Sequence, residues 1–292
     1  MPSRFALVLS ARALSPEAGV AAATLLARVG AVVGPFEAAG DARYEVLTAS
    51  VELDSARLGD AREALAGLAE ADAALVPAGV REAERKFLIM DVDSTLIQQE
   101  VIELLAEHAG KRAEVAAVTE AAMRGELDFA QSLHARVQTL AGLPVEVIDH
   151  VRDAVLLTPG AEELVKAYHA AGHAVAVVSG GFNQILAPLA ERLGLDYWRA
   201  NELEIVDGVL TGRVIGDVVD RAVKEQSLRA WAAERGVELE ACVAVGDGAN
   251  DLDMLGAAGL GVAFHAKPAV RAVADAAVEL PYLDVIRYFA GV

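Results

Sequence analysis

The sequence predicts an α/β protein whose larger part is a doubly wound, mostly parallel β-sheet, preceded by a smaller α+β unit. Short apolar runs without polar alternation, such as residues 87–90, indicate strands that are covered on both faces, as parallel strands are. Such runs alternate with helical patterns along the second part of the chain. Three of them end in polar clusters, and ligands of doubly wound sheets bind just beyond the carboxyl ends of strands.

Length and composition limit the class of protein. A chain of 292 residues predicts one large or two smaller domains, and an apolar content of 54% excludes a disordered chain. No apolar run reaches the roughly 18 residues of a membrane-spanning helix. The apolar stretch Phe5–Leu9 is shorter than a signal-peptide core and is predicted to be a strand.

Charge and cysteine content indicate the cellular compartment and the classes of partner. The single cysteine, Cys242, excludes an internal disulfide, and a cytoplasmic location is the expectation. The formal charge of −18 disfavours nucleic acid and membrane surfaces as partners. An anionic substrate would therefore need a local positive site.

The first 80 residues predict the element order βαββαβ. The predicted elements are a strand at Phe5–Leu9, a helix at Ser15–Val29, a strand near Ala31–Pro35, a strand at Tyr44–Leu53, a helix capped by Asp54 or Ser55 that runs through Ala69, and a strand at Ala73–Pro77. Size and order resemble the ferredoxin-like ACT modules, which bind amino acids or pair subunits, so a regulatory or homodimerisation module is one expectation and a plain structural domain the other. The charged stretch 81–86 places the predicted boundary between domains 1–84 and 85–292.

A helical insert is predicted directly after the strand at 87–90, over about residues 98–157. Its helices are expected at Val101–Ala109, Glu114–Met123, Asp128–Leu140 and Pro144–Val155, with breaks at Gly110, Gly125 and Gly142. An insert in this place can cover groups at the end of the strand, and glycine-containing loops would let it open and close.

The rest of the chain predicts more strands and helices of the same sheet. They are a helix to Ala171, a strand at His173–Val178 that ends in the turn Ser179-Gly180-Gly181, a helix at Asn183–Leu193, a hairpin around Asp207-Gly208, a helix opened by Lys224 that runs to Glu234, and strands at Ala241–Val245, Leu260–Ala263 and Ala277–Leu280. Backbone N–H groups in the Ser-Gly-Gly turn suit an oxyanion, although glycine turns after strands are also ordinary turns.

The residues Asp91 and Asp93 follow the strand at 87–90. Residues two apart in an extended segment point to one side, so these carboxylates would repel each other unless a cation or a proton lies between them. A calcium loop does not fit, because Leu96 stands where glycine is needed and Ile102 where a glutamate is needed. A solvated turn remains the alternative for these residues alone.

The polar clusters together indicate a site for a metal and a phosphate. We expect convergence of the groups that follow the buried strands: Asp91, Asp93, Ser179, Lys224, Asp247 and Asp251. Mg²⁺ suits carboxylate and phosphate oxygens, and no cysteine or histidine cluster is available for zinc. A carboxylate could then attack a phosphoryl group, which is covalent catalysis. No phosphate-binding P-loop or dinucleotide fingerprint occurs.

Residues from about 86 to 265 resemble the phosphatases of the haloacid dehalogenase superfamily. Four motifs stand in that family's order, namely Asp91-Val92-Asp93-Ser94-Thr95, Ser179-Gly180-Gly181, Lys224 and Gly246-Asp247-Gly248-Ala249-Asn250-Asp251. Within the superfamily, the motif wording and a four-helix insert with Glu100, Phe129 and Arg136 resemble the phosphoserine phosphatases. Dehalogenases of the superfamily lack the second aspartate, and its P-type pumps would need membrane spans.

The resemblance implies hydrolysis of O-phospho-L-serine, the last step of serine biosynthesis. Asp91 would be the nucleophile that becomes an aspartyl phosphate, and Asp93 would protonate the leaving oxygen and then activate water. Mg²⁺ would be held by Asp91, Asp247 and the backbone carbonyl of Asp93. The implied substrate-binding and supporting residues are Ser179, Gly180 and Lys224 for the phosphoryl group, Glu100 for the ammonium group, Arg136 for the carboxylate, Phe129, and Asn250 and Asp251.

Alternatives exist for both the residues and the function. Charged residues such as Glu100 and Arg136 commonly form a solvated helix face, and Phe129 could be a core residue. Another small phosphomonoester, or transfer of phosphate to an acceptor other than water, is the near alternative function. A serine-responsive sensor is the alternative from a different class, and the pair Asp91 and Asp93 argues against it, because a sensor does not need both.

Overall fold

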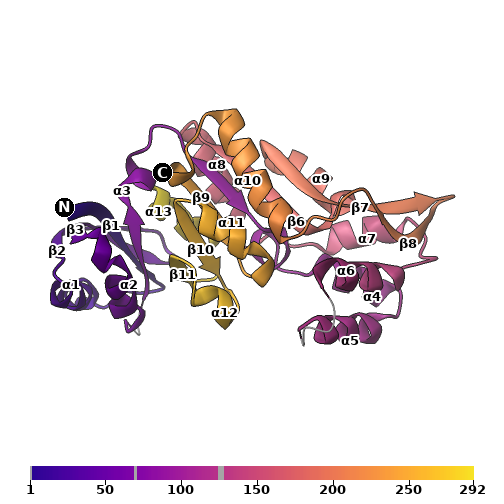
Figure 1. Cartoon of the computed structure of the whole chain (residues 1–292), viewed down its shortest axis with the longest axis horizontal. Helices are drawn as coiled ribbons and strands as arrows, with labels where there is room; N and C mark the ends of the chain where they lie inside the picture. The colour runs from indigo at the N-terminus through magenta and orange to yellow at the C-terminus, as the bar shows by residue number, and fades with distance from the viewer. Residues whose placement is uncertain (1, 69–70, 124–127) are drawn as a thin grey trace.

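The computed structural model describes residues 2–68, 71–123 and 128–292. An amino-terminal unit with its own sheet lies at one end, the helical insert lies at the other, and the main sheet lies between them (Figure 1). Within the described ranges, no helix has the length and apolar character needed to cross a membrane.

The amino-terminal unit has the predicted order βαββαβ. Its elements are β1 (Pro2–Ala11), α1 (Ala18–Arg28), β2 (Val32–Gly40), β3 (Glu45–Asp54), α2 (Leu58–Ala66) and β4 (Asp72–Pro77). The strands pair antiparallel in the order β2-β3-β1-β4. The predicted end of the second helix at Ala69 lies outside the described residues, and α2 ends at Ala66. A short turn precedes α2 and is capped by Asp54, whose carboxylate accepts a hydrogen bond from the Ala56 amide at 3.1 Å.

Alternation along β1 explains why both faces of this sheet are covered. Phe5, Leu7 and Leu9 pack with residues of α1 and α2, whereas Ala6 and Val8 belong to the core of the main unit. Successive side chains of a strand point to opposite faces, so one strand contributes to two cores. The amino-terminal sheet is therefore packed between its own helices and the main unit.

The main unit is the predicted doubly wound sheet. Its strands pair in the order β11-β10-β9-β5-β6-β7-β8, parallel except for the hairpin of β7 and β8. The elements are α3 (Ala78–Glu82), β5 (Phe87–Met90), α8 (Ala161–Ala170), β6 (Ala174–Phe182), α9 (Asn183–Leu193), β7 (Tyr197–Val206), β8 (Val209–Ile215), α10 (Arg221–Arg235), β9 (Cys242–Gly246), α11 (Leu252–Ala257), β10 (Leu260–Phe264), α12 (Pro268–Arg271), β11 (Ala276–Val278) and α13 (Ile286–Ala290).

Helices cover both faces of the main sheet. Leu88 and Met90 of β5 pack on the side of α8, α9 and α13, and Phe87 and Ile89 pack on the side of α10 and α11. This burial on both faces is why β5 is a continuous apolar run rather than an alternating one. The predicted fold class is confirmed.

Two boundaries near the predicted site differ from the prediction. The strand expected to end before Ser179 continues as β6 to Phe182, with a bulge between Val178 and Phe182 in its pairing with β7. The helix expected to open at Lys224 begins at Arg221, because the Asp220 side chain caps it by accepting from the Val223 amide at 2.9 Å. Lys224 therefore lies at the end of the first helical turn.

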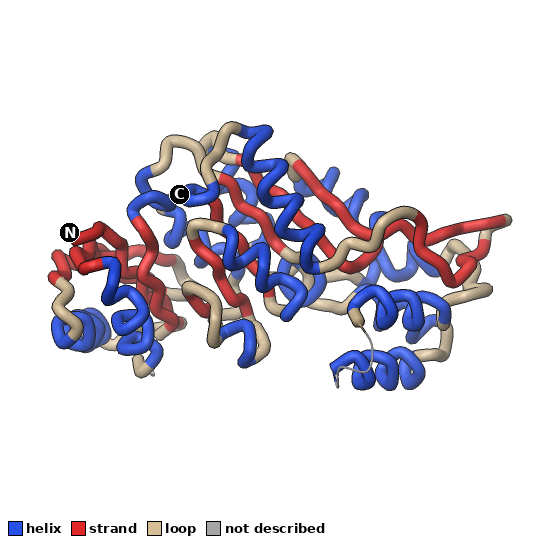
Figure 2. Tube along the Cα trace, in the orientation of Figure 1, coloured by secondary structure: helices blue, strands red, loops and turns tan. Residues whose placement is uncertain are grey.

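The insert contains α4 (Val101–His108), α5 (Arg112–Met123), α6 (Phe129–Gln138) and α7 (Val147–Ala154), and the break predicted at Gly125 lies outside the described residues. Helices and loops make up its described part, beside the strands of the hairpin (Figure 2). The segment that enters the insert and the segment that leaves it are bonded to each other. Ile97 forms an antiparallel bridge with Leu157, and the Thr158 hydroxyl donates a hydrogen bond to the Thr95 carbonyl at 2.6 Å.

The β7–β8 hairpin supports the insert. Its turn has the left-handed residues Asp207 and Gly208, as the Asp-Gly sequence predicts. The amide of Gly142 donates to the carbonyl of Leu210 at 2.8 Å, and the amide of Val145 donates to the carbonyl of Gly208 at 2.9 Å. The loop between α6 and α7 is thereby tied to the main sheet.

Polar contacts, some of them buried, join the amino-terminal unit to the main unit. The fully buried Asp284 accepts hydrogen bonds from Arg43 at 2.6 Å and from the Tyr44 hydroxyl at 2.8 Å. Asp72 accepts from the backbone amides of Glu279 and Leu280 at 2.8 and 2.9 Å. These contacts define one orientation of the two units.

Candidate active site

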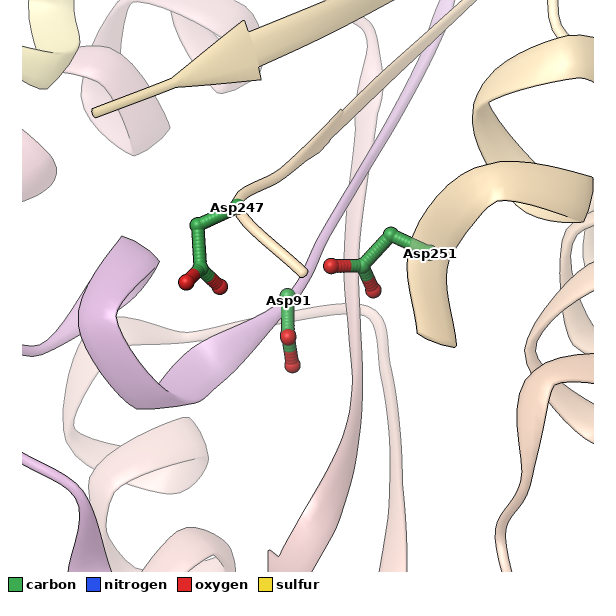
Figure 3. Close-up of side chains that lie close together, drawn as sticks. All are labelled: Asp91, Asp247 and Asp251. Carbon is green, nitrogen blue, oxygen red and sulfur yellow. The ribbon is translucent and has the colours of Figure 1, made fainter. Parts of the chain in front are cut away.

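The predicted polar clusters meet at one edge of the main sheet. β9, β5 and β6 are neighbours and run parallel, so their carboxyl ends lie together. Asp91 directly follows β5 and Asp247 directly follows β9. Their carboxylates and that of Asp251 face one another (Figure 3).

Lys224 joins two of these carboxylates from the first turn of α10. Its ammonium nitrogen lies 2.8 Å from Asp91 Oδ1 and 2.7 Å from Asp251 Oδ1, and the lysine is fully buried. Burial alone would lower the pKa of Lys224, but the charges of Asp251 and Asp91 outweigh burial and raise it. Lys224 is therefore a permanent buried cation, which is the local positive site that an anionic substrate requires.

The donor set fits a divalent metal ion. Carboxylate oxygens of Asp91, Asp247 and Asp251 all lie within 4.8 Å of one another. Burial, followed by the charge of Asp251, raises the pKa of Asp91 against the effect of Lys224. The same two causes raise the pKa of Asp247 to about 6. Crowded acidic oxygens of this kind suit a hard cation such as Mg²⁺, which would offset their mutual repulsion.

Asp93 lies in a different environment from Asp91. Its Oδ1 is buried without a hydrogen-bond partner among the described residues. Burial and then the charge of Glu100 raise its pKa to about 8. The bend that follows includes Ser94 in the left-handed region, with φ of 56°. A raised pKa favours the protonated form of Asp93, which can donate a proton.

The Ser179-Gly180-Gly181 segment lies against Asp93 from the neighbouring strand. The amide of Gly181 donates to Ser179 Oγ at 2.7 Å. A Cβ atom on Gly181 would lie 3.0 Å from an Asp93 carboxylate oxygen, so these two strand ends are in close contact. Ser179 is buried, and its hydroxyl proton remains available for a substrate oxygen.

Phe129 reaches this segment from the insert. A Cβ atom on Gly180 would lie 3.1 Å from Phe129 Cζ, so the ring is in contact with the glycine. Phe129 is the first residue of α6, which begins with a capping box formed by Asp128 and Gln131. The ring is half-buried and lies at the Ser-Gly-Gly segment, whereas a core residue of the insert would be buried among the insert's own helices.

Glu100 and Arg136 both lie close to Asp93. Glu100 accepts a hydrogen bond from the Ser94 hydroxyl at 2.7 Å. Burial lowers the pKa of Arg136, opposed by the carboxylates of Glu100 and Asp93. Arg136 is half-buried and donates to the backbone carbonyl of Ser132 at 3.2 Å. The charges of Glu100 and Arg136 therefore act on Asp93 from the insert, and they match the two charges of an amino acid.

Asp251 and Asn250 shape the loop after β9. Asp251 accepts from the Gly248 amide at 3.0 Å while it holds Lys224, so it couples the loop to α10. Asn250 lies against the same loop, since a Cβ atom on Gly248 would come within 2.3 Å of Asn250 Oδ1. Gly246 has no room for a side chain either, because Asp251 occupies that space.

The sequence did not indicate two residues that the structure brings to the site. The Lys267 amide donates to the Asp247 carbonyl at 3.2 Å, and the Lys267 charge opposes the rise in the pKa of Asp247. Asn201 bonds to Gly180. Asn201 stands in β7 among the polar residues Arg199, Glu202 and Glu204, so no local pattern distinguishes it, and Lys267 follows a strand without any motif around it.

Known proteins share this sequence and fold. Residues 88–256 match the family model of the haloacid dehalogenase-like hydrolases. The chain is 56% identical over 254 residues to the phosphoserine phosphatase of Streptomyces coelicolor, a match that covers 86% of this chain and 62% of that relative. The chain thus spans less than two thirds of the relative's length.

Two solved structures are similar over long stretches. The unliganded crystal structure of a probable phosphoserine phosphatase from Vibrio cholerae has a TM-score of 0.78 at 39% identity, covering 98% of this chain and 86% of that one. A phospho-aspartyl intermediate analogue of phosphoserine phosphatase has a TM-score of 0.67 at 43% identity, covering 71% of this chain and 99% of that one.

Proposed function

Because the chain belongs to the haloacid dehalogenase-like hydrolase family, we propose that it hydrolyses O-phospho-L-serine to L-serine and phosphate with Mg²⁺ as cofactor. The observation that carries the proposal is the arrangement of Asp91, Asp93 and Lys224. One carboxylate is paired with a buried ammonium group, and the next, two residues away, is buried without a hydrogen-bond partner for its Oδ1 among the described residues and has a raised pKa. The first group suits a nucleophile and the second a proton donor.

Substrate binding uses groups that face the carboxyl ends of the strands. The hydroxyl of Ser179, the amide of Gly180 and the ammonium of Lys224 donate to phosphoryl oxygens. Glu100 accepts from the ammonium group of phosphoserine, and Arg136 donates to its carboxylate. Their position beside Asp93, where the leaving oxygen would lie, supports these roles.

The reaction has two steps. Asp91 attacks phosphorus, the bond from phosphorus to the serine oxygen breaks, and Asp93 gives its proton to that oxygen. The ionised Asp93 then takes a proton from a water molecule that attacks the aspartyl phosphate, which releases phosphate and restores Asp91. When bound by Asp91, Asp247 and the Asp93 backbone carbonyl, Mg²⁺ would supply positive charge for the carboxylates and phosphoryl oxygens. Asp251 keeps Lys224 in place, and Asn250 supports the loop.

The proposal extends to the whole chain. Residues 1–84 would form an ACT-like regulatory or homodimerisation domain and 85–292 the phosphatase domain, with a cap over about 98–157. The βαββαβ order and antiparallel sheet support the first assignment. Serine biosynthesis in the cytoplasm is the proposed setting, with phosphoserine rather than nucleic acid or membrane as partner.

A phosphate-release assay with Mg²⁺ across a panel of phosphomonoesters tests the substrate. The panel includes phosphoserine, phosphothreonine, phosphoethanolamine and an aryl phosphate. We expect a higher kcat/KM for phosphoserine than for phosphoethanolamine or the aryl phosphate, because only a substrate with both charges engages Glu100 and Arg136. Equal rates across the panel would favour a phosphatase whose substrate is a different small phosphomonoester. No phosphate release from any member of the panel would favour a serine-responsive sensor.

A further inference from the structure

The side chain of Asn201 connects two parts of the site that are distant in sequence. Asn201 lies in β7 and is 2% exposed. Its Nδ2 donates to the carbonyl of Gly180 at 2.8 Å, and its Oδ1 accepts from the amide of Val219 at 2.8 Å. A side-chain amide offers a donor and an acceptor without charge, and here each faces the matching backbone group.

The first bond compensates for the bulge in β6. Pairing between β6 and β7 shifts between Val178 and Phe182, so the ladder does not pair the groups in between. A carbonyl that the ladder leaves unpaired needs another partner, and Asn201 supplies it for the half-buried Gly180.

This bond also orients Ser179. The Gly180 carbonyl and the Gly181 N–H belong to one planar peptide group, and the N–H donates to Ser179 Oγ at 2.7 Å. Fixing the carbonyl therefore fixes the direction of the N–H. With one lone pair of Oγ engaged, the Ser179 proton is directed away from the Gly181 N–H.

The second bond sets the start of α10. Val219 is buried and stands directly before Asp220, the residue that caps α10. Lys224 lies at the end of the first turn, and its ammonium reaches Asp91. The position of the Val219 amide thereby affects the position of Lys224.

We propose that Asn201 is a positioning residue that holds Ser179 and Lys224 at one fixed separation, so that both donate to the same phosphoryl group. The inference rests on the proposed function, in which these two residues bind phosphate. Asn201 touches neither the substrate nor the reacting atoms. Loss of its bonds misplaces two donors at once, and misplacement by about 1 Å costs about a hundredfold in rate.

The test compares Asn201→Ala with Gln184→Ala. Gln184 is a matched control, because its side-chain amide also bonds to β7. It donates to the Leu203 carbonyl at 2.9 Å and accepts from the Leu203 amide at 3.1 Å, and its partners are Leu203 and Glu202 rather than the phosphate-binding groups. The readouts are Tm, kcat/KM for phosphoserine and for an aryl phosphate, and the Kd of inorganic phosphate by calorimetry with Mg²⁺.

We expect Asn201→Ala to lose about a hundredfold in kcat/KM for both substrates alike and to bind phosphate at least about tenfold more weakly. Gln184→Ala should lower Tm while kcat/KM stays within about threefold of the wild-type value. A purely structural Asn201 would behave like Gln184, with a lower Tm and near-normal kcat/KM and phosphate Kd, and this result would overturn the proposal.

Asn201→Asp provides a second variant of the same size. In this variant, the ionised carboxylate can accept a hydrogen bond from the Val219 amide but repels the Gly180 carbonyl. The protonated carboxyl group can again donate a hydrogen bond to that carbonyl. The kcat/KM of this variant, divided by the wild-type value at the same pH, should therefore rise as the pH is lowered from about 8 to about 5. A ratio that stays constant contradicts the role of the donated hydrogen bond.

Failure of the proposed substrate and failure of the Asn201 proposal give different results. A wild-type protein that ignores phosphoserine but hydrolyses the aryl phosphate rejects the substrate alone, and the aryl phosphate and phosphate-binding readouts still test Asn201. A wild-type protein that neither hydrolyses an aryl phosphate nor binds phosphate rejects both.

Discussion

Asp91 and Asp93 are two residues apart and lie in different environments. Asp91 is paired with Lys224 at 2.8 Å, whereas Asp93 Oδ1 has no partner within the described ranges and the Asp93 pKa rises to about 8. The sequence predicted that both residues matter, but the difference in protonation depends on Lys224 and Glu100, which the fold brings to them.

These raised pKa values predict how stability depends on pH without metal. A carboxyl group with a raised folded pKa contributes stability that is complete below its unfolded pKa of about 4 and is lost as the pH rises through the folded value. The folded values are about 6 for Asp247 and about 8 for Asp93. The Tm of protein treated with EDTA should therefore fall as the pH rises through this range.

Added Mg²⁺ should raise Tm more at the alkaline end, because the ionised carboxylates bind it best. The measurement is thermal unfolding at several pH values with and without Mg²⁺. An equal Mg²⁺ effect at about pH 5 and at about pH 8.5 would show that these carboxylates do not hold the ion.

Substrate choice is predicted to depend on Arg136. Arg136→Ala should lower kcat/KM for phosphoserine by about a hundredfold, because deleting one partner of a desolvated charge pair costs a few kcal/mol. Phosphoethanolamine, which lacks the carboxylate, should lose little. The measurement is the ratio of the two kcat/KM values.

The control for this change is Arg112→Ala, since Arg112 is an exposed arginine of the same insert, 3.7 Å from Glu107. It should leave both substrates unaffected. If Arg136→Ala leaves the ratio of the two substrates where it was, Arg136 does not contact the carboxylate.

At the scale of elements, the apolar runs and turn residues predicted most strands and helices. The helix at Asn183–Leu193 and the hairpin at Asp207-Gly208 follow directly from local patterns. The start of α10 was wrong because several polar residues before Lys224 could serve as a cap, and only the bond from Val223 to Asp220 selects one. The bulge in β6 depends on pairing with β7, which no local pattern of β6 contains.

The cap of α10 is predicted to affect activity as well as stability. Asp220→Ala removes the bond to the Val223 amide and should cost about 1 kcal/mol of unfolding free energy. Because Lys224 lies in the turn that this cap stabilises, kcat/KM should also fall several-fold. Steady-state kinetics and denaturant unfolding check both effects.

Asp54→Ala is the matched control for the cap. Asp54 caps a turn in the amino-terminal unit by the same kind of bond, to the Ala56 amide. Its loss should cost a similar free energy without any change in kcat/KM. Equal kinetics in the two variants would mean that the first turn of α10 does not need its cap to place Lys224.

At the scale of the whole molecule, the two units share a buried polar interface around Asp284. Sequence patterns predicted each unit and the polar stretch between them, but contacts between Tyr44 and Asp284 join residues 240 positions apart. Such pairs follow from how the units pack, and a single sequence contains no local signal for them.

Tyr44→Phe should lower the unfolding free energy by about 1–2 kcal/mol, because it leaves Asp284 with one donor fewer in a buried site. Tyr168→Phe is the control, since the buried Tyr168 hydroxyl has no hydrogen-bond partner among the described residues, and its removal should have little effect. Denaturant unfolding measures both. Equal losses in the two variants would show that the bond to Asp284 contributes nothing measurable.

The central claim is that Asp91 carries the phosphoryl group during turnover. The most direct measurement mixes the protein and Mg²⁺ with phosphoserine labelled in its phosphoryl group, quenches with acid within a turnover, and locates the label by peptide mass spectrometry. We expect label on the peptide that contains Asp91, and none in Asp91→Asn. With a labelled aryl phosphate, whose leaving group needs no proton, Asp93→Asn should accumulate more label because hydrolysis of the intermediate slows. Rapid turnover with no labelled peptide in wild type or Asp93→Asn, or near-normal activity in Asp91→Asn, would contradict the covalent mechanism.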